Sequence, residues 1–101
     1  MKIERHLVPE MTIEEFAERN GLVMEVHERE NQKLPKYYAQ FKDVWVKDGI
    51  VISGKFGNGK TEEEAIKDYT NEINLQLLVV GAFRGNNRRE LQVPRLIKKE
   101  Q

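Results

Sequence analysis

The segment of this sequence with the most specific chemistry is residues 54–61, Gly-Lys-Phe-Gly-Asn-Gly-Lys-Thr. It matches the pattern G-x-x-x-x-G-K-[ST], in which backbone N–H groups surround phosphates, the lysine neutralises them and the hydroxyl binds Mg²⁺. An apolar run at residues 50–53 precedes it and a helical pattern follows it, which is the order that such a loop requires. A nucleotide site here would use Gly59, Lys60 and Thr61.

Three features argue against phosphate binding at this segment. The dipeptide Asp-Gly at 48–49 is typical of a tight hairpin, so the strand before the glycines is expected to be antiparallel, whereas enzymes with this loop use a parallel sheet. Three glutamates at 62–64 suit the helix dipole but would repel a polyphosphate. The next apolar run, residues 77–80, leads to Gly-Ala-Phe and not to an aspartate for magnesium. We therefore expect these glycines to turn a strand into a capped helix.

Composition narrows the class of protein. The 101 residues suffice for one domain, with a core at 12–94 and terminal extensions at 1–10 and 95–101. Charged residues make up 34% of the chain and cancel to zero formal charge, which argues against strong overall attraction to nucleic acid or membrane. Without cysteine, a signal peptide or a long apolar segment, the chain is expected to be cytoplasmic and to have no contact with a membrane.

Capping signals predict two helices. Thr12 with Glu15 forms a capping box, and Gly21 supplies the left-handed residue that follows a helix end. Thr61 with Glu64 starts the second helix, whose apolar residues at helical spacing are expected to face a sheet.

Alternating and β-branched residues predict five strands, at about 22–26, 37–46, 50–56, 77–83 and 89–93. The alternation slips between Phe41 and Val44, which indicates a bulge at 42–43. The predicted fold is α+β, an antiparallel sheet with two helices on one face in the order α-β-β-β-α-β-β. The expected core comprises Phe16, Leu22, Met24, Val26, Phe41, Val44, Ile50, Ile52, Ile66, Tyr69, Ile73, Leu78 and Val80.

The order α-β-β-β-α over residues 12–76 resembles the double-stranded-RNA-binding domain. The segment Pro-Lys-Tyr-Tyr-Ala-Gln-Phe at 35–41 resembles that family's entry into its second strand, and 57–65 resembles its glycine-rich turn into the second helix. The β-β-β-α-β order and its glycine-rich segment are also similar to HicB-type antitoxins, which bind a small toxin. Small phage and bacterial proteins often have such sequences.

The RNA contacts that the first resemblance implies are poorly matched. The family places lysines at the start of the second helix, where this chain has Lys60 and Lys67 separated by the glutamates at 62–64. The loop at 30–34 lacks the histidine that enters the minor groove in that family. Phosphate contacts supply most of the affinity for a duplex, so the resemblance supports the fold more than RNA binding.

Two other groups of residues are candidates for a binding site. Tyr38 and Trp45 lie on the long middle strand, where an exposed aromatic side chain would indicate a protein interface, although such residues also stack bases or fill cores. A basic hairpin and tail would contact nucleic acid or keep an edge strand soluble. Its residues are Arg84, Asn86, Asn87, Arg88, Arg89, Arg95, Lys98 and Lys99.

No other pattern indicates catalysis. His6 and His27 have no second ligand at metal spacing, and no serine has a matching histidine and acid, so we expect neither an enzyme nor a metal or cofactor. The leading hypothesis is a small regulatory module that binds a protein partner or a second copy of itself. Nucleic-acid binding is the alternative, and nucleotide binding is the third.

Overall fold

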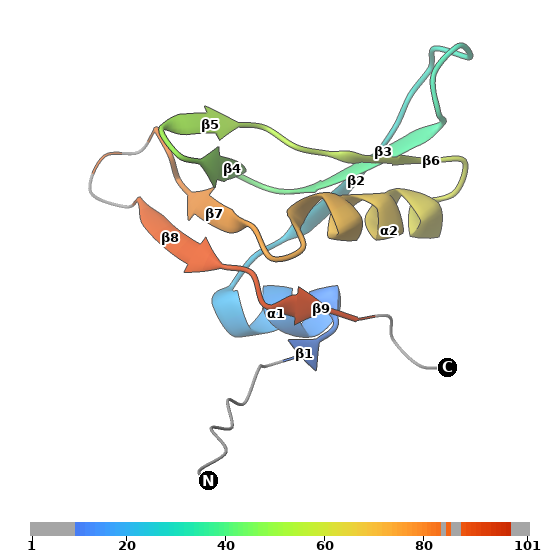
Figure 1. The fold of residues 1–101 in the computed structure, drawn as a ribbon. Coiled ribbons are helices and arrows are strands. Elements are labelled where there is room, and N and C mark those ends of the chain that lie inside the picture. The colour runs from blue at the N-terminus through green and yellow to red at the C-terminus, as the bar shows by residue number, and fades with distance from the viewer. Residues whose placement is uncertain (1–9, 84, 86–87, 98–101) are drawn as a thin grey trace, which may run out of the picture.

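The computed structural model describes residues 10–83, 85 and 88–97. Two helices and nine strands follow one another in this part of the chain (Figure 1). In order they are β1 (Glu10–Met11), α1 (Ile13–Asn20), β2 (Met24–Glu28), β3 (Tyr37–Phe41), β4 (Val44–Asp48), β5 (Val51–Ser53), β6 (Gly57–Gly59), α2 (Glu62–Ile73), β7 (Leu77–Val80), β8 (Arg89–Gln92) and β9 (Arg95–Leu96).

The strands divide among three sheets instead of the single sheet expected. One has the order β2-β3-β6 and another β5-β4-β7-β8, both antiparallel, while β1 and β9 form a short parallel pair. The predicted α+β class, with antiparallel sheets and two helices, is confirmed. The two larger sheets are continuous through the chain, because β3 leads directly into β4 and β5 leads into β6.

The passage from β3 to β4 lies at the predicted bulge. Phe41 and Val44 are both buried although three positions separate them, and Asp43 between them has a positive φ of 59°. Between the two ladders, residues 40–45 on one segment lie opposite 54–56 on the other. The extra residues shift the alternation, so that both halves of the segment keep their apolar side chains on the core side.

The β4–β5 hairpin corrects two expected core residues. Ile52 pairs with Lys47, so it shares the outward face of the hairpin and is only half-buried. The second correction comes from the turn. Asp48 pairs with Val51, so the central turn residues are Gly49 and Ile50, not Asp48 and Gly49. Gly49 has a φ of 62°, the conformation that favours glycine at the first central position of such a turn. Ile50 therefore points into solvent and is 100% exposed.

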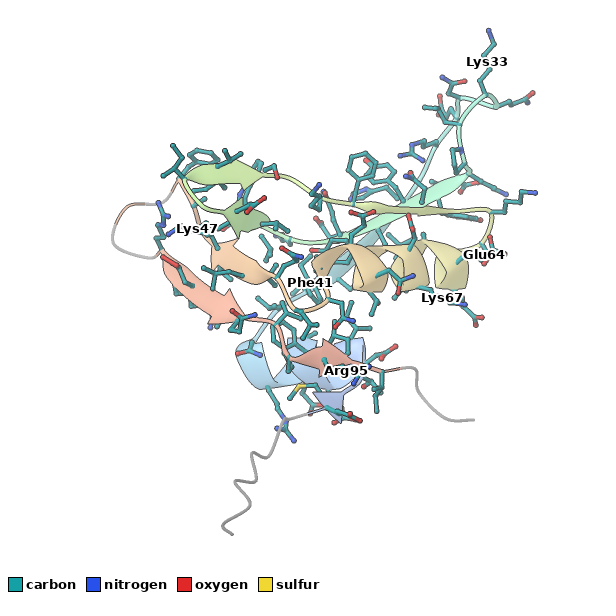
Figure 2. All side chains as sticks on the ribbon, in the orientation of Figure 1. Lys33, Phe41, Lys47, Glu64, Lys67 and Arg95 are labelled. Atoms are coloured by element: carbon teal, nitrogen blue, oxygen red, sulfur yellow. The ribbon has the colours of Figure 1, made fainter. Side chains whose placement is uncertain are left out.

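Most other expected core residues are buried or packed against the core, and the sequence prediction missed several others. Those missed are Met11, Ile13, Ala39, Val46, Ala65, Val79, Val93 and Leu96. Phe41 lies at the centre, with its ring 5.4 Å from that of Tyr69 and 6.3 Å from that of Phe16 (Figure 2). A residue of α1 and a residue of α2 thus both pack against Phe41 of β3.

Both helices begin, and α1 also ends, as the predicted caps indicate. The Thr12 hydroxyl accepts a hydrogen bond from the Glu15 backbone, and Gly21 follows α1 in the left-handed conformation. The Thr61 hydroxyl accepts a bond from Glu64 at the start of α2. Figure 1 shows α2 directly beneath β3 and β6, and α1 further down on the same side of these strands.

The folded part extends beyond the expected core of 12–94. Leu96 in β9 is buried, and its backbone N–H donates to the Asn74 side chain at the end of α2. The Ile97 N–H donates to the Met11 carbonyl, which joins β9 to β1. Residues from both ends of the described chain therefore close the core beside α1.

Candidate functional site

The three strands β2, β3 and β6 present two different faces. Val26, Ala39 and Gly57 form one row across the strands, and this row lies toward α2. Since side chains alternate along a strand, the next row of His27, Tyr38 and Asn58 lies on the opposite face. Figure 1 shows both helices on the α2 side, and no described element lies over the other side. We call this second side the uncovered face.

A compact group of rings occupies one part of the uncovered face. The His27 ring stacks on Tyr38 with 4.8 Å between centroids, and Phe56 meets Tyr38 edge to face at 5.9 Å. The Arg29 guanidinium lies 4.5 Å from the Tyr38 centroid and 5.8 Å from that of Phe56. We call His27, Arg29, Tyr38 and Phe56 the aromatic–arginine cluster. Stacking and cation–π contacts hold its rings in place while part of their surface stays open to solvent.

Trp45 lies on the same side of the other large sheet. Val44 and Val46 are buried toward the core, so Trp45 between them points outward, where it is half-buried. Its ring contacts Phe83 edge to face at 5.2 Å, and Phe83 is 79% exposed. Phe41, four residues earlier in the chain, is buried as expected, so Trp45 is the ring of this segment that reaches the surface.

Two polar atoms near these rings are buried without a hydrogen-bond partner in the part of the chain that the structure describes. They are Trp45 Nε1 and Asn58 Oδ1. A buried polar group with no partner costs about 1–3 kcal/mol, and such groups often indicate a place where water or a ligand group binds. Both belong to residues of the uncovered face.

Charged side chains lie next to the rings at two places. The Lys47 ammonium lies 3.2 Å from the Glu90 carboxylate, which places an ion pair beside Trp45 and Val79 (Figure 2 labels Lys47). His27 Nε2 lies 3.9 Å from Glu25 at the other end. A centre of aromatic residues with a charged rim is the usual composition of a protein interface.

The predicted basic surface lies only partly within the described residues. Arg84, Asn86, Asn87, Lys98 and Lys99 lie outside them, while Arg88, Arg89 and Arg95 lie inside and are exposed. The Arg89 guanidinium donates to the Asn20 carbonyl at 2.5 Å, so it neutralises the C-terminal end of α1. Arg95 lies in β9 opposite Glu10 of β1. Among the described arginines, one therefore has a structural contact and another faces an acidic neighbour.

Two of the three glycines in the phosphate-loop segment, Gly57 and Gly59, lie inside a strand. Gly57 and Gly59 belong to β6 and pair with Ala39 and Tyr37, and a Cβ on either glycine would overlap backbone atoms of α2. The Lys60 N–H donates to the Glu64 carboxylate at 3.0 Å, and the Asn58 N–H donates to Asp68 at 2.8 Å. Carboxylates therefore occupy the backbone donors that a phosphate would need, and these glycines have a packing role.

In the part of the chain that the structure describes, no group of three His, Asp or Glu side chains comes together as a set of metal ligands. No helix in that part is long and apolar enough to cross a membrane.

Comparisons with protein-family models, with curated proteins and with solved structures find no match to this chain. The resemblance to double-stranded-RNA-binding domains and HicB-type antitoxins therefore depends on the local residues and the order of elements alone. The fold and the chemistry of the uncovered face carry the functional argument.

Of the residues on this face, sequence reasoning selected Tyr38 and Trp45 but missed His27, Arg29, Phe56 and Phe83. His27 and Tyr38 are cross-strand neighbours because the β2–β3 register places them opposite each other. The alternation within each strand, combined with this register, would have placed both side chains on the same face. Phe56 and Phe83 were the last residues of two predicted strands, but β5 ends at Ser53 and β7 ends at Val80. Both rings therefore lie outside the regular strands, where alternation carries no information.

Proposed function

We propose that this chain is a non-enzymatic binding module that contacts a protein partner through the uncovered face. The observation that carries the proposal is the aromatic–arginine cluster. Its four side chains come from β2, the residue that follows β2, β3 and the β5–β6 connection, and they stack on a face that no described element covers. Tyrosine, tryptophan and arginine are the residues that most often dominate binding energy at protein interfaces.

The rings suit a protein partner better than a nucleic acid. His27 and Phe56 both already contact Tyr38, so a base would have to separate a pair of rings to stack between them. A protein partner needs only to cover their exposed surfaces and edges. The charged neighbours of the rings include both signs, as in the Lys47–Glu90 pair, whereas a phosphate backbone favours a surface of uniform positive charge.

Capture of binding partners tests this function. Tagged wild-type protein and the double variant Tyr38→Ala/Phe83→Ala are used as bait in a cell extract, and the captured chains are quantified by mass spectrometry. We expect the double variant to lose its specific partner by tenfold or more, since removal of a hot-spot ring costs at least about 1–2 kcal/mol. Sedimentation velocity of the same proteins shows whether the partner is a second copy.

Two controls separate the alternatives. Leu75→Ala removes another exposed apolar side chain, at the end of α2, and should leave capture unchanged. Arg88→Ala should also leave it unchanged. The proposal is wrong if duplex RNA, duplex DNA or a single strand binds with an affinity that falls steeply with salt and with each arginine removed, while the aromatic variant binds normally.

A further inference from the structure

A second surface lies on the helix side of the molecule, between α1 and α2. It is an apolar groove of about 360 Å³. Its apolar lining consists of Ile13, Ala17, Leu22, Met24, Phe41 and Ile66. Figure 1 shows α1 and α2 as separate layers on the same side of the strands, so this groove faces away from the aromatic–arginine cluster.

The groove has a buried floor and open walls. Ile13 and Phe41 are 5% and 1% exposed and belong to the core. The other four apolar residues are only half-buried, although they pack against that core. Ala17 lies on the α1 wall, where its single methyl group leaves space that a longer side chain would fill. The groove therefore exposes apolar surface that a ligand side chain would remove from water.

One wall of the groove is acidic. Glu14 and Glu18 line it beside Ala17, four positions apart on α1, which places them on one side of the helix. Both are exposed, and neither forms an ion pair with another residue of the described chain. A cationic group bound in line with α1 would be within reach of both carboxylates.

We propose that this groove docks a segment of a partner protein in which one or two large apolar side chains are flanked by lysine or arginine. The apolar side chains would occupy the space over Ile13 and Phe41, and the basic flanks would lie along Glu14 and Glu18. A volume near 360 Å³ is at the lower end of the range for ligand pockets, which suits one or two side chains. A fatty acid or another anionic apolar ligand would bring its charge against two carboxylates.

This site is separate from the one used by the proposed function, so either can fail without the other. The test uses ¹⁵N-labelled protein titrated with capped peptides, followed by amide chemical shifts. The probe is Lys-Lys-Leu-Phe-Lys-Lys, and the comparison peptides are Glu-Glu-Leu-Phe-Glu-Glu and Lys-Lys-Ala-Ala-Lys-Lys. We expect the probe to shift the amides of Ala17, Glu18, Leu22 and Ile66, with an affinity about tenfold above that of either comparison peptide.

Variants of the protein locate the site. Glu14→Gln/Glu18→Gln should weaken binding of the probe about tenfold and make it less dependent on salt. Ala17→Phe should abolish binding by filling the groove, with a melting curve to show that the variant folds. The matched control Glu62→Gln/Glu63→Gln removes two exposed carboxylates from α2 outside the groove and should change nothing. Tyr38→Ala should also leave binding intact.

The inference is overturned if the probe and its acidic counterpart bind equally well. It is also overturned if millimolar probe shifts no groove amide, or if Ala17→Phe folds and still binds. Should Ala17→Phe fail to fold, the two glutamine variants decide, because both change only exposed side chains.

Discussion

The two faces of β2, β3 and β6 are built in opposite ways. Toward α2, the row across the strands contains Ala39 and Gly57, and the helix backbone approaches so closely that Gly57 has no room for a Cβ. On the uncovered face, the next row contains the large rings of His27 and Tyr38. On the first face, small residues let α2 pack closely against the strands, which stabilises the fold. On the other face, large side chains are presented that contribute little to the core. Stability and recognition should be separable by mutation.

The largest effect is expected at Gly57. Gly57→Ala adds one methyl group that would overlap the backbone of Tyr69 and Ala65, so α2 must move away from the sheet. We expect a loss of about 3 kcal/mol or more in the free energy of unfolding, at or above the usual range for overpacking. Urea denaturation of the variant against the wild type measures it.

Gly54→Ala is the matched control, because a Cβ at Gly54 would meet the outward-facing Trp45 and not α2. A Cβ at Gly54 would lie 3.1 Å from Trp45 Cζ3, an atom of a half-buried side chain, and no backbone atom lies within 4 Å. We expect a loss of less than about 1 kcal/mol. Equal losses at Gly54 and Gly57 would show that the two faces do not differ as described.

The next largest effect is expected at Tyr69, whose ring packs from α2 against Phe41 of β3. Burial raises the pKa of Tyr69 to about 12 from an ordinary value of 10.0, while a hydrogen bond with the Phe41 backbone opposes this shift. The tyrosine is neutral in the folded state, and the unfolded chain loses its phenolic proton first as pH rises. Its contribution to stability is therefore complete below pH 10 and is lost as pH rises through about 12.

A tyrosine shift of this size corresponds to about 2–3 kcal/mol of stability lost at the alkaline end. Because lysines titrate in the same range, the useful quantity is the difference between wild type and Tyr69→Phe. We expect the wild type to lose more stability than the variant between pH 9 and pH 12, by urea denaturation at each pH. Parallel curves for the two proteins would place Tyr69 in a more solvated environment than the core described above.

A smaller effect is expected from the large ring on the opposite face of β3. Tyr38 contacts other surface side chains, whereas Phe41 on the same strand contacts both Tyr69 and Phe16. Tyr38→Ala should therefore change the free energy of unfolding by only about 1 kcal/mol, because its contacts with His27, Phe56 and Arg29 lie at the surface. Phe41→Ala, measured beside it, should cost about 3–5 kcal/mol. A large loss at Tyr38 would assign the cluster to stability and not to recognition.

Local chemistry predicted the helix ends well. Thr12, Gly21 and Thr61 act through hydrogen bonds within a few residues, and all three occupy the positions that their residue types indicate. The bulge at 42–43 was also visible as a slip in alternation. What the slip could not show is that the chain changes sheets there, because this depends on pairing with β6 and β7, which are distant in sequence.

The wrong expectations have a similar cause, because each depended on pairing or packing that the local sequence does not show. Asp48-Gly49 was assigned to the centre of the hairpin turn, and a shift of one residue moved Ile50 from the core to solvent. Leu96 was assigned to a tail because a two-residue parallel pair with β1 leaves no periodic pattern. Gly57 looked like a turn residue, although glycine in a strand also indicates a close approach of another backbone. The uncovered face could be recognised only from the register of β2, β3 and β6, which places His27, Tyr38 and Asn58 in one row.

The smallest effect is expected from the ligand that the glycine pattern first suggested. If Gly57 and Gly59 are glycine because α2 lies against β6, Mg-ATP has no site there, since Glu64 also occupies the Lys60 N–H at the start of α2 (Figure 2 labels Glu64). We expect no change in melting temperature with millimolar Mg-ATP, whereas a ligand at 100 times its dissociation constant would add about 2.7 kcal/mol. A stabilisation that Lys60→Ala removes and Arg88→Ala retains would assign the glycines to phosphate binding, and the description of the inner face as a packing surface would then be incomplete.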